Sequence, residues 1–144
     1  KASFKAKYGY ELGCPETWER LRDIAEFFTR DTNGDGKINF HGYHGYRARK
    51  FASKWWLQRF LSMGKLPFDK NMNPLIDGPE GVHATKQFVA VHKFMHPDVL
   101  GWGTAQHYPY FGSGKVAPFI AWGSAMSWTP FRTRTLPCVA ESAC

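Results

Sequence analysis

The stretch Pro15-Glu-Thr-Trp-Glu-Arg-Leu-Arg-Asp-Ile-Ala-Glu-Phe-Phe-Thr29 carries the clearest structural signal in the sequence. Its apolar side chains recur every three or four residues, which is the spacing of one face of an α-helix. Those side chains are Trp18, Leu21, Ile24, Ala25 and Phe28. Thr17 stands where a helix N-cap is expected. The pattern predicts an amphipathic helix over residues 16–29 that packs one face on the rest of a domain.

The residues on the N-terminal side of this helix carry a second helical signal. Phe4 and Tyr8 are four residues apart and Gly9 follows, as in the last turns of a helix that a glycine closes. The chain therefore begins inside an element. We expect it to be an internal piece of a longer protein.

The C-terminal side predicts helices over residues 49–63 and 79–95, with Pro79 at the first helical position. Residues 38–43 alternate like a short strand, and residues 115–121 form a second, apolar strand. Residues 69–77 are expected to form a loop or short hairpin. Helices that alternate with short strands indicate an α/β domain, with helices packed on a small mixed sheet. Residues 130–144 have no periodicity and are expected to be an irregular tail.

Composition sets limits on function without choosing one. The 144 residues suffice for one domain, and no apolar run reaches the roughly 20 residues of a membrane-spanning helix. Aromatic residues make up 17% of the chain, more than core packing requires, which suggests a surface on which ligand rings or apolar faces stack. The net charge of +7 is spread along the chain at helix-surface spacings, so a solvated face is favoured over a binding patch.

Two motifs have the spacing of metal sites. The stretch Asp31-Thr-Asn-Gly-Asp-Gly-Lys37 places oxygen ligands as a calcium loop does, but the twelfth position, normally a bidentate Glu, is Gly42. A turn capped by its own carboxylates is expected instead. His92 and His96 are four residues apart on one face of the predicted helix, without a third ligand. The sequence therefore predicts no metal and no cofactor.

Catalytic signatures are also missing from the sequence. It contains no nucleophile elbow, no paired carboxylates and no phosphate-binding glycine loop, so we expect no enzyme activity. Three cysteines leave one thiol unpaired in any disulfide scheme and settle no redox compartment. The first residue is Lys1, and a signal peptide is not part of this chain.

Six short segments occur in the order in which family 1 extracellular solute-binding proteins carry them, and together they resemble that family over residues 1 to about 128. The segments are Phe4-Lys-Ala-Lys-Tyr-Gly-Tyr-Glu-Leu12, Pro15-Glu-Thr-Trp-Glu19, Asp23-Ile-Ala-Glu-Phe-Phe-Thr29, Asp31-Thr-Asn-Gly-Asp-Gly-Lys37, Asp77-Gly-Pro-Glu-Gly81 and Phe111-Gly-Ser-Gly-Lys-Val-Ala117. One position departs from the family pattern. Pro118 cannot donate a ladder hydrogen bond, so its strand must be an edge, bulged or shifted.

The resemblance implies a two-lobed periplasmic-binding-protein type II fold, in which residues 1–129 form part of one lobe and the second lobe is missing. It implies non-catalytic capture of a sugar-like or other polar solute for an ABC importer. The permease in the membrane would be the partner, and the location would be periplasmic or extracellular. By the same resemblance, Trp122 and Ser124 line the solute cleft, together with Tyr46, Arg47 and Trp102.

Two other functions stay open at this point. A basic, aromatic nucleic-acid binder would be favoured if Arg47, Arg49, Lys50 and Lys54 clustered beside exposed Tyr43 and Tyr46. A lobe with uncovered sheet edges could instead self-associate in a structural or assembly role.

Overall fold

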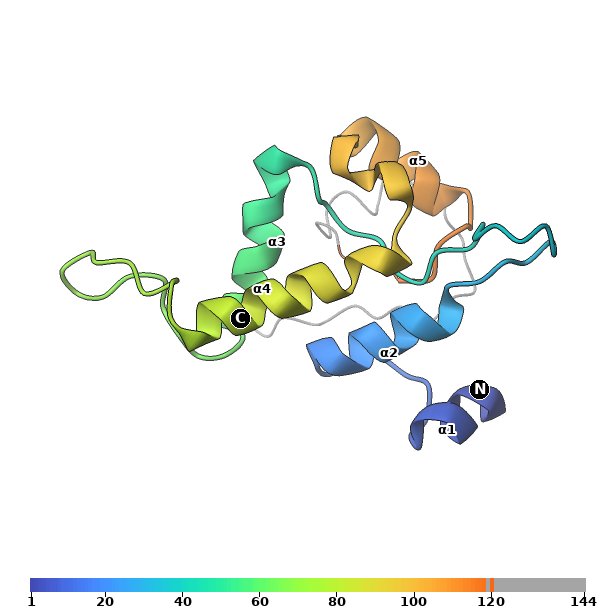
Figure 1. Cartoon of the computed structure of the whole chain (residues 1–144), viewed down its shortest axis with the longest axis horizontal. Helices are drawn as coiled ribbons and strands as arrows, with labels where there is room; N and C mark the ends of the chain where they lie inside the picture. The colour runs from blue at the N-terminus through green and yellow to red at the C-terminus, as the bar shows by residue number, and fades with distance from the viewer. Residues whose placement is uncertain (119, 121–144) are drawn as a thin grey trace.

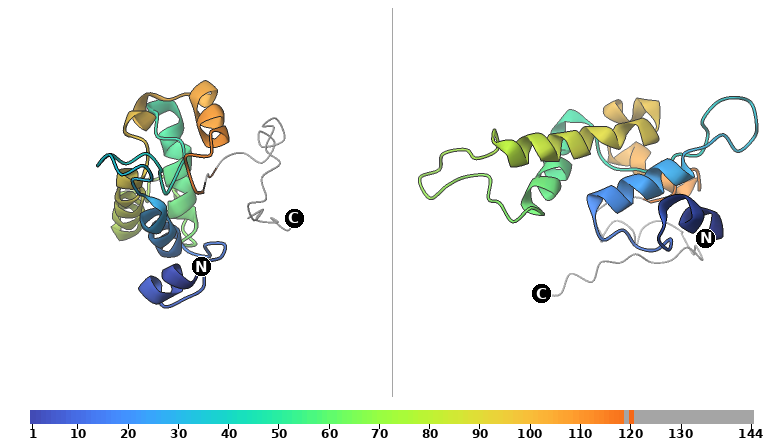
Figure 2. Two further views of the ribbon diagram at one scale, coloured as in Figure 1. Left: turned by 90° about the vertical axis from the view of Figure 1, so that its right-hand side faces the viewer. Right: turned by 60° about the horizontal axis from the view of Figure 1, so that its bottom comes forward.

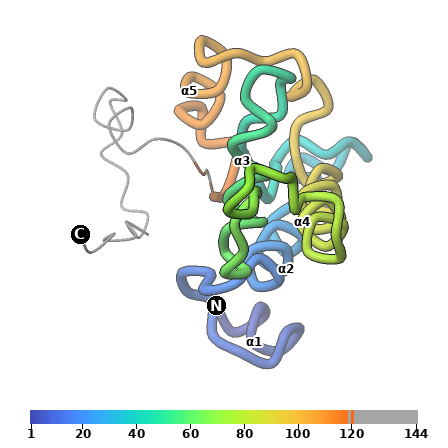
Figure 3. Tube along the Cα trace, turned by 90° about the vertical axis from the view of Figure 1, so that its left-hand side faces the viewer, coloured from blue at the N-terminus to red at the C-terminus, as the bar shows by residue number. Residues whose placement is uncertain are grey.

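The computed structural model describes residues 1–118 and 120. Its elements, in order, are the helices α1 (Ala2–Tyr8), α2 (Trp18–Phe28), α3 (Arg49–Leu61) and α4 (Pro79–Ala90), the 3₁₀ turns η1 (His92–Phe94) and η2 (Pro97–Gly101), and helix α5 (Thr104–Gly112). Helix α4 packs against both α3 and α2, while α1 and α5 lie at opposite ends (Figure 1; Figure 3). None of the helices in this described part is long and apolar enough to cross a membrane.

The first two helices form as their sequence predicts. Gly9 ends α1 with a left-handed φ of 81°, and its N–H donates to the carbonyl of Lys5. A residue with a Cβ is strained in that conformation, which explains the glycine. Thr17 caps α2 by accepting a hydrogen bond from the backbone N–H of Arg20 at 3.2 Å.

The predicted helix 79–95 is too long. The α-helix starts at Pro79 as expected but ends at Ala90, and the chain tightens into the 3₁₀ turn η1. The backbone N–H of Phe94 donates to Val91, three residues back, which is a common way for an α-helix to end. His92 and His96 therefore do not share a helical face, and the geometric premise for a zinc pair is wrong.

The predicted sheet is reduced, within the described residues, to isolated pairings. The two expected strands meet in one parallel bridge between His41 and Val116. The N–H of His41 donates to Lys115 at 2.9 Å, and the N–H of Ala117 donates back to His41 at 3.0 Å. A separate antiparallel bridge joins Arg30 to Phe40. The two segments thus run side by side without forming a regular ladder.

Pro118 sits where this pairing shifts. The next pairing with this segment is made by His44. Its N–H donates to the carbonyl of Pro118 at 2.9 Å, and its carbonyl accepts from the N–H of Ile120 at 3.2 Å. Between these two pairings, the N–H of Tyr43 turns away and donates to the carbonyl of Phe94. Pro118 contributes only a carbonyl and needs no N–H. The expected strand is replaced here by isolated pairings, in which the missing N–H of Pro118 leaves no gap.

The loop 41–47 is the centre of the domain and is buried along its whole length. It crosses the C-terminal end of α2, where the N–H of Gly42 donates to the hydroxyl of Thr29 at 3.0 Å. The main hydrophobic cluster gathers α2, this loop and the 91–99 segment, and consists of Leu21, Ala25, Tyr43, Val91, Phe94, Met95 and Val99.

Two loops extend from opposite ends of the domain (Figure 2). Residues 31–39 form the expected carboxylate-capped turn, because Asp31 accepts hydrogen bonds from the backbone of Asn33, Gly34 and Gly36. The other loop contains the short hairpin closed by the Phe68–Pro74 bridge. It exposes several apolar side chains, among them Leu66, Met72 and Leu75.

Candidate functional site

The structure brings two of the predicted site residues close to a common third residue. Tyr46, on the buried loop, is 0% exposed, and its ring lies 4.1 Å from that of His107 on α5. Trp102, which ends η2, is half-buried, and its ring lies 5.9 Å from the same His107. Trp122 and Ser124 lie outside the described residues.

These residues belong to a larger group of rings that we call the aromatic–histidine cluster. It joins the buried loop to the η2–α5 segment and consists of His41, His44, Tyr46, His96, Trp102, His107 and Tyr110. Its inner members, His44, Tyr46 and His107, are fully buried. Its outer members, His96, Trp102 and Tyr110, are half-buried and can be reached by solvent.

Hydrogen bonds between ring atoms fix the cluster. His44 Nε2 and His107 Nδ1 share a hydrogen bond of 2.8 Å. His41 Nδ1 and the Tyr110 hydroxyl share one of 2.6 Å. Each bond joins the loop to α5, more than sixty residues further along the chain. The loop and helix are therefore held together by polar contacts as well as by ring packing.

The buried imidazoles are kept neutral. Burial lowers the pKa of His44 to about 3, with a further contribution from His107, and burial lowers the pKa of His107 to about 4. The pKa of His41 is lowered by burial and then by His96. At neutral pH the inner cluster thus carries no charge, and its rings present donors, acceptors and flat faces.

The outer rings offer a surface for a ligand with an apolar face. The rings of His96 and Trp102 are stacked, with centroids 4.7 Å apart and planes 28° apart. Tyr110 meets the Trp102 ring edge-on at 4.9 Å. Such a surface suits stacking against the C–H face of a polyol or sugar, while nearby imidazole nitrogens can bond hydroxyl groups.

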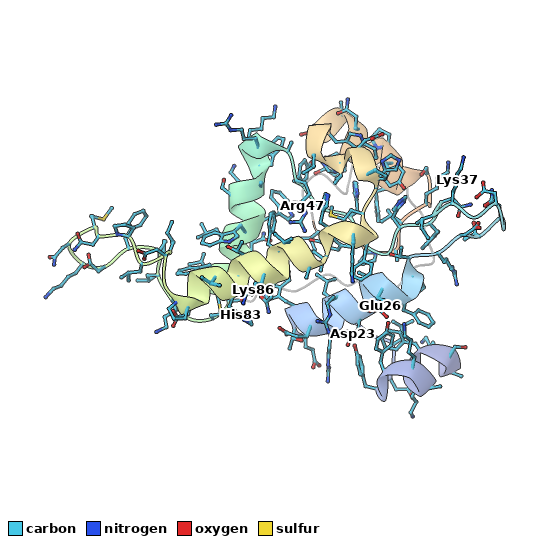
Figure 4. The ribbon with its side chains drawn as sticks, viewed as in Figure 1. Asp23, Glu26, Lys37, Arg47, His83 and Lys86 are labelled. Atoms are coloured by element: carbon cyan, nitrogen blue, oxygen red, sulfur yellow. The ribbon has the colours of Figure 1, made fainter. Side chains whose placement is uncertain are left out.

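Arg47 directly follows Tyr46 of the cluster in the sequence, but its side chain contacts α4 instead of the cluster. Its guanidinium lies 3.6 Å from the ring centre of Phe88 on α4, and only 6% of the residue is exposed. Figure 4 shows Arg47 between α3 and α4. The structure therefore does not bring Arg47 to the outer rings with Trp102.

Comparison with known proteins identifies the family. The model of bacterial extracellular solute-binding proteins matches residues 1–130. The chain belongs to this family. A comparison with curated proteins gave no match.

Two solved solute-binding proteins share the fold of this family member. One is an ABC transporter solute-binding protein from Agrobacterium radiobacter K84 in complex with ribitol, with 19% identity, a TM-score of 0.65 and 83% of this chain covered. The other comes from Agrobacterium vitis S4 with bound D-mannitol, with 20% identity, a TM-score of 0.65 and 87% covered. This solute-binding chain spans 29% and 30% of their lengths.

The structure does not meet the condition that would favour nucleic-acid binding by this family member. It requires Tyr43 and Tyr46 to be exposed beside the basic residues of α3, and both rings are fully buried. Arg47 is buried as well, which leaves Arg49 and Lys50 at the exposed start of α3 and Lys54, also exposed, further along the helix. No feature of the described residues favours nucleic-acid binding over solute binding.

Sequence reasoning missed His96, His107 and Tyr110 as parts of the aromatic–histidine cluster. His96 was considered only as a metal ligand, and among residues 1–118 and 120 no group of three or more His, Cys, Asp or Glu side chains is arranged for a metal ion. One local signal existed. His107 and Tyr110 are three residues apart, a spacing that places two side chains on one face of a helix, but that face could not be matched to the loop 41–47 without the fold.

Proposed function

We propose that this chain is part of one lobe of a type II solute-binding protein and that it helps to capture a sugar, a sugar alcohol or a similar polar solute for an ABC importer. The observation that carries this proposal is the family match over residues 1–130. Both solved proteins of the same fold were crystallised with a sugar alcohol, ribitol or D-mannitol. Capture requires no bond to be broken, so the function is non-catalytic.

The solute would lie against the outer rings of the aromatic–histidine cluster. Trp102 supplies the stacking face, and His96 and Tyr110 flank it with polar atoms. Trp122 and Ser124 complete the same site in this proposal, with an indole face and a hydroxyl. Tyr46 and Arg47 remain predicted solute contacts, and because both are buried, a solute reaches them only when the loop 41–47 moves.

The remaining expectations follow from this role. The opposite lobe would close over the solute, and a membrane permease would receive it, at a periplasmic or extracellular location. Residues 1–129 form the partial lobe, and residues 130–144 are the tail. Self-association of the isolated chain stays a prediction, which light scattering after size-exclusion chromatography tests directly.

Saturation-transfer NMR with D-mannitol and ribitol tests the proposal because it detects weak binding. One-sided stacking must overcome the cost of ordering the ligand, so we expect a Kd on the order of millimolar for this chain alone. Trp102→Ala should abolish the signal, and Trp56→Ala, whose indole bonds to Thr85 elsewhere on α3 and α4, should retain it. Signals that survive Trp102→Ala unchanged would refute this placement of the site.

A further inference from the structure

Two arginines are buried on the same aromatic ring. Arg47, which precedes α3, is 6% exposed, and Arg59, near the end of α3, is 1% exposed. Their guanidiniums lie 3.6 and 5.2 Å from the ring centre of Phe88 on α4. Arg59 also lies 4.2 Å from the ring of Trp18, at the start of α2. Three helices and the buried loop therefore enclose two positive charges.

Most of the buried hydrogen-bond donors of this pair have no acceptor. Arg47 donates through Nε to the sulfur of Met95 at 3.2 Å, and Arg59 donates through Nη1 to the carbonyl of Trp55 at 2.8 Å. Within residues 1–118 and 120, Arg47 Nη2 and Arg59 Nε and Nη2 are buried without a hydrogen-bond partner. Buried guanidinium N–H groups normally donate hydrogen bonds to oxygen atoms. The three unpaired nitrogens therefore indicate a position at which the oxygen atoms of a ligand would bind.

Within residues 1–118 and 120, no carboxylate forms an ion pair with either arginine. The α2 carboxylates Asp23 and Glu26 form ion pairs with Arg22 and Lys7. Burial is the main cause that lowers the pKa of Arg47 to about 10; Tyr43 opposes this shift and the charge of Arg59 adds to it. Arg47 therefore stays protonated at neutral pH. Aromatic faces attract a cation but supply no acceptor for its N–H groups.

Buried charges in proteins are nearly always paired, because an unpaired ion forfeits its hydration. Two like charges beside one ring add repulsion to that loss. An anion with several oxygens would remove the repulsion and accept the free N–H donors, since guanidinium forks match carboxylate and phosphate geometry. Phe88 is half-exposed, so solvent reaches the ring that both arginines contact.

We propose that Arg47 and Arg59 form a binding site for a small oxyanion of the phosphate or carboxylate class, separate from the solute surface at Trp102. The anion enters beside Phe88 and joins the loop 41–47 to α3. Occupancy stabilises the folded chain. The site goes beyond solute capture, because neither arginine has a described contact with the outer rings; Arg47 is the one residue that it shares with the predicted solute contacts.

Thermal unfolding in sodium phosphate, compared with sodium chloride at equal ionic strength, tests the site. Phosphate at about ten times its Kd should raise Tm by about 4 °C above the chloride value, because a ligand that binds only the folded state stabilises it by mass action. Sodium acetate should also raise Tm, with the half-maximal rise at a higher concentration than for phosphate. Arg47→Met and Arg59→Met should each lose the phosphate-specific rise, and Arg49→Met, at the exposed start of α3, should keep it.

A measurement on the unmodified chain guards against a variant that fails to fold. In ¹H–¹⁵N spectra, the side-chain Nε–H of Arg59 should shift with phosphate along a saturable curve. A Tm that rises no more in phosphate than in chloride overturns the proposal. So does an equal rise in Arg47→Met and Arg59→Met, or an Arg59 resonance that does not move.

Discussion

Gly42 lies directly against the carbonyl oxygen of Ala25 on α2, so closely that a Cβ at position 42 would come within 1.6 Å of that oxygen. Thr29 secures the approach: its hydroxyl donates to the Ala25 carbonyl at 2.8 Å and accepts the N–H of Gly42 at 3.0 Å. This contact seats the loop 41–47 on the end of α2. The loop in turn carries His44 and Tyr46 to α5.

Gly42→Ala should therefore destabilise the chain by about 3 kcal/mol or more, since the added methyl group meets backbone rather than a movable side chain. Urea denaturation followed by circular dichroism measures the change. Gly13→Ala is the matched control, because nothing lies within 4 Å of its added Cβ. A loss below about 0.5 kcal/mol for Gly42→Ala would contradict the observed packing.

Stability should fall as pH drops from about 7 to 5. His44 and His107 have folded-state pKa values of about 3 and about 4, below the unfolded value near 6.5, so the unfolded state binds more protons in this window. Each histidine then removes up to about 1.4 kcal/mol of stability per pH unit. Denaturation at several pH values should give a flatter dependence for His107→Phe than for the unmodified chain.

Phe4→Ala should loosen α1 from the domain. Phe4 is 0% exposed and packs against Tyr8, Tyr10 and Phe27 with ring centroids 4.7 to 5.2 Å apart. Removing a buried Phe side chain costs about 3–5 kcal/mol. Phe68→Ala, on the exposed hairpin at 44% exposure, should cost less than about 1 kcal/mol. Equal losses for the two variants would show that α1 is not docked as described.

Calcium and zinc should not bind specifically. Asp31 already accepts three backbone N–H bonds within its own turn, and His92 begins η1 whereas His96 is the N-cap residue of η2. Calorimetric titration with calcium chloride and with zinc chloride should show no stoichiometric heat. A one-to-one isotherm in the micromolar range for either ion would contradict this prediction.

Local patterns in the sequence predicted the parts of the fold that local physics determines. The apolar spacing in residues 16–29, the Thr17 cap and the closure of α1 by Gly9 all depend on neighbours within one helical turn. The end of α4 was missed because Phe94 and Met95 continue the apolar spacing through a tighter 3₁₀ turn. The spacing alone does not distinguish the two helix types over so few residues.

The candidate site depends on contacts that no local pattern contains. The bond between His44 and His107 crosses 63 residues, and the stacking of Arg47 on Phe88 depends on how α3 and α4 cross. The family resemblance implied that Tyr46 and Arg47 line the solute cleft, yet the structure buries both residues. Of the predicted residues that the structure describes, Trp102 has a side chain within reach of solvent.

Mapping of ¹H–¹⁵N chemical shifts during titration with D-mannitol and ribitol tests the solute-capture proposal most directly. We predict saturable shifts of the Trp102 indole N–H and of backbone amides near His96 and Tyr110, with none for a single-stranded oligonucleotide at the same concentration. Shifts confined to Arg49 and Lys50 on adding the oligonucleotide, with no response to either polyol, would contradict the assignment of this chain to solute capture.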